Sequence, residues 1–100
     1  MPGFHVSVAH NLTQEEAVRR MQNLLRDVKA EFADKIGDLR EVWDGHIGTF
    51  RFSAMGMPVD GILTVNPEQV DIAGNLPFAA MFFRERIESL IRERAEALLA

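Results

Sequence analysis

The fold of this chain is decided by residues 39–73, which read LREVWDGHIGTFRFSAMGMPVDGILTVNPEQVDIA. Three turn signals divide this stretch, at Asp44-Gly45, Met55-Gly56 and Asn66-Pro67. An Asp-Gly pair between strand-forming residues favours a two-residue hairpin, because a type I′ turn needs positive φ at both central positions. The stretch therefore predicts four short strands, and their connections are too short for anything but antiparallel neighbours.

Apolar side chains alternate along the second and third of these strands. The set expected to face inward is Phe50, Phe52 and Ala54 in the second strand, and Met57, Val59, Gly61, Leu63 and Val65 in the third. A period of two indicates a sheet with one buried face and one solvated face. For Trp43 two alternatives stay open: it faces inward with Leu39, or Val42 is the buried partner instead.

The flanking sequences predict one more strand and two helices. Phe4, Val6 and Val8 alternate with polar residues, which indicates a first strand. Thr13 and Glu16 have the spacing of a capping box, and an apolar stripe of helical period predicts a helix from there to about residue 33. Residues 36–38 are expected to return the chain to the sheet.

The second helix is expected to run from Pro77 almost to the end of the sequence, since proline suits a first helical turn. Its inner stripe is Phe83, Ile87, Leu90, Ile91 and Leu98. Arginines and glutamates alternate on the other side, which predicts a solvated face paired with itself.

The element order is therefore β-α-β-β-β-β-α in a single α+β domain covering residues 1–100. Two helices packed on one face of an antiparallel sheet form a common two-layer architecture. We expect a curled sheet with the last helix lying across its concave side, as in helix-grip folds. That likeness concerns the architecture and carries no function.

Composition excludes several kinds of site and partner. The 100 residues contain no cysteine, which excludes disulfides, thiolate metal sites and a cysteine nucleophile. The formal net charge is -4 and no basic block occurs, which argues against nucleic-acid binding. No apolar run reaches the roughly 20 residues that span a bilayer, and residues 1–5 lack a secretory signal pattern. We expect a cytoplasmic protein without a transmembrane segment.

The sequence shows no catalytic constellation. His5, His10 and His46 do not have the spacing of a metal-binding pair, and His10 is expected to bond a backbone carbonyl and fix its turn. No serine lies in a nucleophile elbow. Asp60 and Asp71 are expected on the solvated face, as near neighbours if their strands pair. We therefore expect no enzyme, no metal and no cofactor.

The start of the second helix is the most unusual stretch. Its first two turns are apolar on nearly every side, at Leu76, Phe78, Met81, Phe82 and Phe83. One stripe can face the sheet, and the rest is either covered by the first helix and loop or exposed. An exposed set would suit a partner, a second subunit, or a lipid or polymer surface. Met55 and Met57 in the neighbouring turn could extend it with adaptable side chains.

A third alternative is a cavity between the helices and the curled sheet. Its expected lining is Phe50, Phe52, Leu63 and Phe82. An apolar cavity of this kind could take an acyl chain or another hydrophobic ligand.

Several of these features, taken in order, resemble the small bacterial family of polyhydroxyalkanoic acid system proteins over nearly the whole chain. The matching residues are His10-Asn11-Leu12, Glu16-Ala17, Trp43, Gly45, Phe50, Phe52, the run from Gly56 through Val59 to Gly61, and Leu76-Pro77. The resemblance implies a small cytoplasmic protein associated with polyhydroxyalkanoate storage. The family has no established catalytic residues, so none is transferred.

Two functions follow as expectations. The first is a non-enzymatic accessory or binding protein that acts through an apolar surface formed by Phe78, Met81 and Phe82, against a polyhydroxyalkanoate granule or in a homodimer. The second is a small domain that binds an acyl or other hydrophobic ligand between the sheet and the last helix. An exposed apolar surface favours the first function, and an apolar cavity favours the second.

Overall fold

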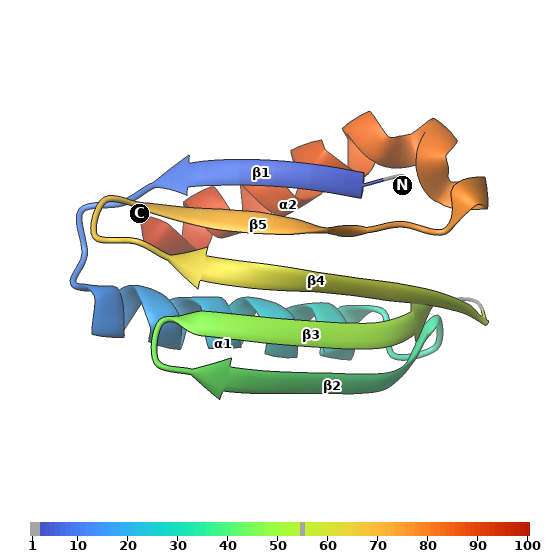
Figure 1. The fold of residues 1–100 in the computed structure, drawn as a ribbon, viewed down its shortest axis with the longest axis horizontal. Coiled ribbons are helices and arrows are strands. Elements are labelled where there is room, and N and C mark those ends of the chain that lie inside the picture. The colour runs from blue at the N-terminus through green and yellow to red at the C-terminus, as the bar shows by residue number, and fades with distance from the viewer. Residues whose placement is uncertain (1–2, 55) are drawn as a thin grey trace.

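The computed structural model describes residues 3–54 and 56–100. The elements along the chain are β1 (Gly3–Ala9), α1 (Gln14–Glu31), β2 (Ile36–Asp44), β3 (Ile47–Ala54), β4 (Met57–Val65), β5 (Gln69–Asn75), the 3-10 helix η1 (Phe78–Phe83) and α2 (Arg84–Leu99) (Figure 1). The expected α+β class and the expected order of strands and helices are confirmed.

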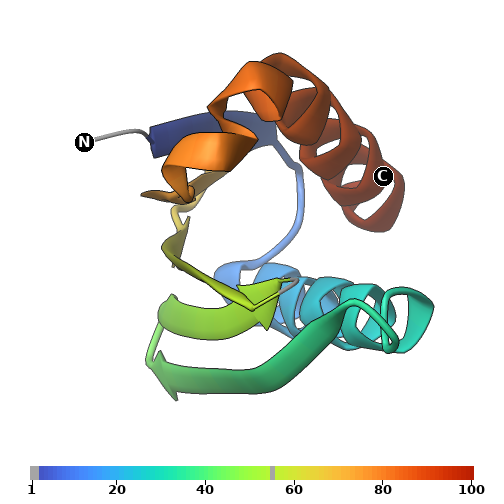
Figure 2. The same cartoon turned by 90° about the vertical axis from the view of Figure 1, so that its right-hand side faces the viewer.

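The five strands form one antiparallel sheet in the order β1-β5-β4-β3-β2. Residues 36–75 form the predicted meander, and β1 adds to it beside β5. Both helices lie on the same face, with α2 behind β1 and β5 and α1 behind β3 and β4 (Figure 1). Figure 2 shows that the sheet curls around this face, so the two helices cover different halves of it.

The strand β2 begins earlier than expected. Ile36 pairs with Ala54 and Gly37 pairs with Ser53, so these residues belong to the sheet and not to the connection before it. The register then shifts between Gly37 and Arg40, and Asp38 has a positive φ of 54°. A bulge of this kind breaks the period of two, which explains why the alternation of side chains did not reveal the start of β2.

The last strand and both helices also have different ends from those expected. The strand β5 continues to Asn75 because β1 pairs with it along its whole length, whereas α1 ends at Glu31. The prediction of one continuous helix from Pro77 is wrong, since η1 precedes α2. Residues 78–83 are apolar at every position, so no single apolar stripe selects an α-helical face for them.

Two glycines lie opposite each other at the centre of the sheet, beneath two phenylalanine rings. Gly61 pairs with Phe50 on one side and with Gly74 on the other, and Gly74 pairs in turn with Phe4. A Cβ atom at Gly74 would come within 2.2 Å of the Asp60 backbone oxygen and 2.9 Å of the Phe4 ring. Both rings are buried, so this row of four residues forms the floor beneath the helices.

Trp43 faces the helices, which decides between the two alternatives left by the sequence. A Cβ atom at Gly48, its partner on β3, would lie 2.6 Å from the indole ring. Val42 points to the other face and is 66 % exposed. The small residue at 48 therefore makes room for the large ring beside the core.

The free edge of β1 is covered by side chains of α2. The amide of His5 donates to the Glu88 carboxylate (2.9 Å), and the carbonyl of Ser7 accepts from Arg92 (2.8 Å). These bonds occupy backbone groups that would otherwise be open to another strand. No helix among residues 3–54 and 56–100 is long and apolar enough to cross a membrane.

Candidate functional site

An apolar cavity lies between the curled sheet and the two helices. Its volume is about 430 Å³, and it is partly open to solvent. The lining side chains from the sheet include Phe4, Phe50, Phe52, Leu63 and Ile72, and those from the helices include Leu24, Leu25, Val28, Ala80, Phe83, Ile87, Leu90 and Ile91. The volume falls within the range of about 300–1,000 Å³ that is usual for ligand pockets.

Three of the four residues expected to line a cavity lie in its wall, namely Phe50, Phe52 and Leu63. The rings of Phe50 and Phe52 stack with their centroids 6.3 Å apart. Phe82 was also expected there, and that prediction is wrong, because its side chain is 89 % exposed. The neighbouring Phe83, which the sequence predicted on the inner stripe of the second helix, lines the cavity.

Arg94 of α2 is the charged residue in the lining, and it pairs with Glu31 at the end of α1. The two terminal nitrogens of its guanidinium each contact one carboxylate oxygen: Nη2 donates to Glu31 Oε1 (2.6 Å), and Nη1 pairs with Glu31 Oε2. Hydrogen bonding to Arg94 lowers the pKa of the Glu31 carboxyl. The expectation that the charges of the last helix pair among themselves is therefore wrong for Arg94.

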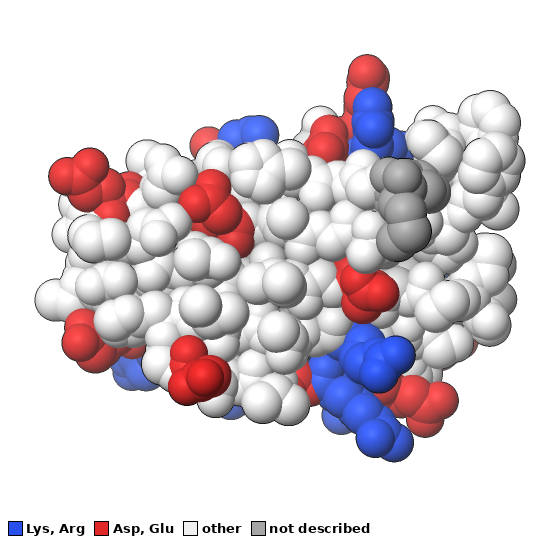
Figure 3. All heavy atoms as spheres, viewed as in Figure 1, with Lys and Arg blue, Asp and Glu red and all other residues white. Residues whose placement is uncertain are grey.

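One side of the 3-10 helix η1 is exposed to solvent and carries apolar side chains. Phe78 is 78 % exposed, Phe82 89 % and Phe83 59 %, and Met81 is also exposed. Helix α1 and the first loop therefore do not cover this segment. In Figure 3 the end of the molecule at the right, where η1 lies, is largely free of charged side chains.

Of the two methionines expected beside this surface, the structure describes Met57. Met57 is half-buried and belongs to the cavity lining. Met55 lies outside the described residues. Among the described residues, this exposed apolar surface is therefore made by η1, and we call Phe78, Met81 and Phe82 the η1 patch.

His10 fixes the loop between β1 and α1. Its backbone amide donates to the Glu68 carbonyl (2.9 Å), and its ring Nε2 donates to the Asn66 carbonyl (2.9 Å). Nδ1 accepts from the amide of Leu12 (3.1 Å), which leaves the ring hydrogen on Nε2. The ring is buried, so the prediction that His10 bonds a backbone carbonyl and holds its turn is confirmed.

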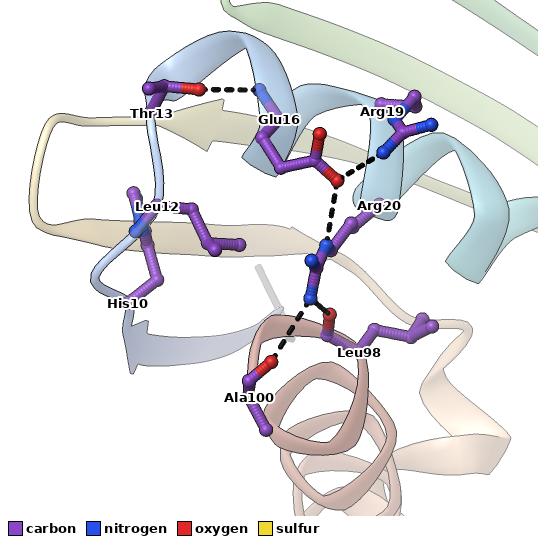
Figure 4. Close-up of polar contacts among 8 residues, drawn as sticks. All are labelled: His10, Leu12, Thr13, Glu16, Arg19, Arg20, Leu98 and Ala100. Atoms are coloured by element: carbon purple, nitrogen blue, oxygen red, sulfur yellow. Dashed lines mark hydrogen bonds and ion pairs between the residues drawn. The ribbon is translucent and has the colours of Figure 1, made fainter.

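The start of α1 is capped and tied to the end of α2 (Figure 4). Thr13 Oγ1 accepts from the Glu16 amide (3.1 Å), as the capping box predicts. The Glu16 carboxylate does not return to the cap. It accepts from Arg19 Nη2 (2.5 Å) and Arg20 Nε (2.9 Å), and these two bonds, led by that to Arg19, lower its pKa.

Arg20 points to the C-terminal end of α2, as Figure 4 shows. Its Nη1 donates to the carbonyls of Leu98 (3.0 Å) and Ala100 (3.1 Å). A cation in this position satisfies helix-end carbonyls and interacts favourably with the helix dipole. Sequence spacing alone does not predict this contact, because Arg19 and Arg20 lie three and four residues after Glu16 and so have a partner within α1.

Ser, His and Asp side chains meet on the outer face of the sheet, but their order is not that of a catalytic triad. Asp71 accepts from the Ser7 hydroxyl (2.5 Å), and His5 Nε2 lies 3.6 Å from the same oxygen. The histidine is thus not placed between the other two, where it would accept the serine proton. Asp71 also accepts from Gln69, and the bonds from Ser7 and then Gln69 lower its pKa.

The expectation that Asp60 and Asp71 are near neighbours is wrong. In the observed register Asp60 pairs with Asn75, and Asp71 pairs with Thr64 four residues further along β4. Asp60 accepts instead from the Asn75 side chain (3.0 Å). Within the described residues, no group of three or more His, Asp or Glu side chains could hold a metal ion.

The sequence of this chain is similar to a known protein family. The family model of the polyhydroxyalkanoic acid system proteins matches residues 4–99. No curated protein matches the chain. The matched range runs from the first buried ring of β1 to the end of α2, so it takes in the cavity, the η1 patch and the contacts in Figure 4.

Proposed function

Because this chain belongs to the polyhydroxyalkanoic acid system protein family, we propose that it is a non-enzymatic binding protein of polyhydroxyalkanoate storage. It attaches to the surface of the stored polyester through the η1 patch. The observation that supports the proposal is the exposure of Phe78 and Phe82, at 78 % and 89 %, on one short 3-10 helix. A cytoplasmic location is part of this proposal.

The chemistry of the patch suits a neutral, apolar surface. The segment 78–83 carries no charged side chain, so its burial against polymer requires no charge to leave water. Full burial of two phenylalanine side chains contributes about 3–6 kcal/mol in total. Only part of this free energy remains after the loss of motional freedom on binding, so attachment is expected to be reversible.

The position of the patch lets it contact a surface without unfolding the domain. Leu76, two residues before Phe78, is buried in the core, so the chain that leads into η1 is anchored while the rings of Phe78 and Phe82 are exposed. When these rings contact a surface, they lose only the water around them, and the core stays closed.

The test is co-sedimentation with purified polyhydroxybutyrate granules of the wild type and of the double variant Phe78→Ser/Phe82→Ser. The matched control is Val42→Ser/Ile62→Ser, which removes two exposed apolar side chains from the outer face of the sheet. We expect the patch variant to lose most granule binding and the control to keep it. Circular dichroism checks that each variant is folded.

Light scattering after size exclusion separates this function from self-association. If the wild type is a dimer and the folded patch variant is a monomer, the patch is a subunit interface and the proposal is wrong. Equal granule binding by the wild type and the patch variant also overturns it.

A further inference from the structure

The cavity between the sheet and the helices has walls that suit a hydrocarbon. Its lining combines rings from β1 and β3 with aliphatic side chains from α1 and α2. Apart from Arg94, every lining side chain among the described residues is apolar, so away from this residue the side chains of the wall present no polar group that a ligand must satisfy. A polar ligand would lose its water without replacement in such a space.

The size of the cavity suits one flexible chain. Its volume of about 430 Å³ corresponds to roughly 14 water molecules at a liquid volume of about 30 Å³ each. The Phe50 and Phe4 rings do not fill this space, because Gly61 and Gly74 have no side chain and the rings lie close against the sheet backbone there. An apolar occupant would restore the contacts that the lining atoms lack.

Arg94 belongs to the cavity lining and is also partly exposed to solvent. The Arg94 side chain is 33 % exposed, and Glu31, its partner, is 46 % exposed. The Arg94 fork has the geometry for a carboxylate and can bind it at two points. An exposed ion pair contributes little to stability, so Glu31 can return to water at low cost when another carboxylate takes its place.

We infer that the cavity binds one acyl chain that ends in a carboxylate, with the hydrocarbon tail among the ring and aliphatic side chains and the carboxylate on Arg94 in place of Glu31. This site is separate from the η1 patch. The two share one structural element, because Phe78 and Phe82 point outward from η1 whereas Ala80 and Phe83 line the cavity.

Binding of the hydrocarbon tail in the cavity is tested by isothermal titration calorimetry with dodecanoate and with 1-dodecanol. In the variant Ala80→Phe the added ring occupies cavity space, and we expect roughly tenfold weaker binding of both probes. Ala97→Phe adds the same ring at an exposed position of α2 outside the lining and should bind as the wild type does. If dodecanoate does not bind the wild type, or binds Ala80→Phe equally well, the inference is wrong.

Recognition of the ligand carboxylate by Arg94 is tested with substitutions of Arg94 and of Glu31. Arg94→Gln should weaken dodecanoate binding roughly tenfold and leave 1-dodecanol within about twofold, because only the acid uses the guanidinium. Glu31→Gln removes the competing carboxylate and should strengthen dodecanoate binding about two- to fivefold. Arg86→Gln, at an exposed position of the same helix, is the charge control.

An equal loss for the acid and the alcohol in Arg94→Gln would overturn the assignment of the head group. A second copy of the chain could fill the cavity instead, and this outcome would appear as a dimer of the wild type to which neither probe binds. Such a result overturns the inference.

The two proposed sites can be tested separately, because a variant that disrupts one site should leave binding at the other unchanged. Ala80→Phe and Arg94→Gln keep both rings of the η1 patch, so they should still sediment with polymer granules. Phe78→Ser/Phe82→Ser keeps the cavity lining and should still bind dodecanoate.

Discussion

Phe50 lies directly over Gly61 of the neighbouring strand, so closely that a Cβ atom at Gly61 would come within 2.3 Å of the ring atom Cζ. The same added atom would lie 2.8 Å from the Ala73 backbone oxygen. The absence of a side chain at 61 therefore lets the ring rest on the strand backbone, and the space above the ring becomes part of the cavity.

This contact predicts that Gly61→Ala destabilises the fold. Because the ring and a backbone oxygen both block the new methyl group, we expect a loss of about 1–3 kcal/mol in the free energy of unfolding, measured by urea denaturation. Gly37→Ala is the control, since a Cβ atom there meets nothing within 4 Å. Equal stability of the two variants would contradict the packing of Phe50 on Gly61.

Arg20 should matter more for stability than Arg19, although both bind Glu16. Arg20 also donates to two carbonyls at the end of α2, whereas Arg19 is exposed and binds within its own helix. We expect Arg20→Gln to lower the free energy of unfolding by about 1–2 kcal/mol and Arg19→Gln to change it by less than about 0.5 kcal/mol. Urea denaturation compares the two, and equal losses would show that the contacts with α2 contribute nothing.

The ring of His10 joins the loop before α1 to the turn between β4 and β5. His10→Ala leaves the Asn66 carbonyl and the Leu12 amide without their partner, so we expect a loss of about 1–3 kcal/mol. His5→Ala, at an exposed position in the same strand region, should change stability much less. Hydrogen exchange provides a second measurement, because faster exchange of the Leu12 amide should accompany the loss in His10→Ala.

Asp71 should make stability depend on pH in the acid range. Hydrogen bonds from Ser7 and Gln69 hold the pKa of its carboxyl in the folded protein below the ordinary value of 3.8. The unfolded chain then binds more protons in this range, so the stabilisation is present above pH 3.8 and is lost as pH falls through the lower folded pKa. We expect Asp71→Asn to be less stable than the wild type at neutral pH and to lose less stability on acidification.

Thermal unfolding between about pH 5 and about pH 2 checks this expectation. Asp34→Asn removes an exposed carboxylate beyond the end of α1 and serves as the charge control. An equal decrease of the midpoint temperature in wild type and Asp71→Asn would mean that the outer-face hydrogen bonds do not stabilise the fold.

The sequence predicted the elements wherever a local signal was strong. Asp44-Gly45 predicted the place of the first hairpin, and Thr13 predicted the start of α1. The expected type I′ turn is wrong, because Asp44 pairs with Ile47 and, of the central residues Gly45 and His46, only Gly45 has a positive φ, of 60°. Where long-range pairing overrides local pattern, the prediction was less accurate. β2 begins at Ile36 through a bulge, and β5 continues to Asn75 because β1 lies beside it.

The candidate site was predictable in part for the same reason. Phe50, Phe52 and Leu63 share the inner face by strand period alone, and the structure places them in the cavity wall. Helical spacing also placed Phe83 on the inner stripe, and it lines the cavity, whereas the expectation that Phe82 lines it too is wrong because that side chain is exposed. The pairing of Arg94 with Glu31 joins residues of two different helices, and these residues lie 63 positions apart in the sequence.

By itself, the sequence determined the class of fold, the inner face of each central strand and the family, because turns, caps and side-chain periods act over a few residues. Only the tertiary structure decided the place of β1 beside β5, the two paired glycines beneath Phe4 and Phe50, the exposure of the η1 patch and the place of Arg94 in the cavity lining. Each of these depends on how distant segments pack, and packing is a property of the whole chain.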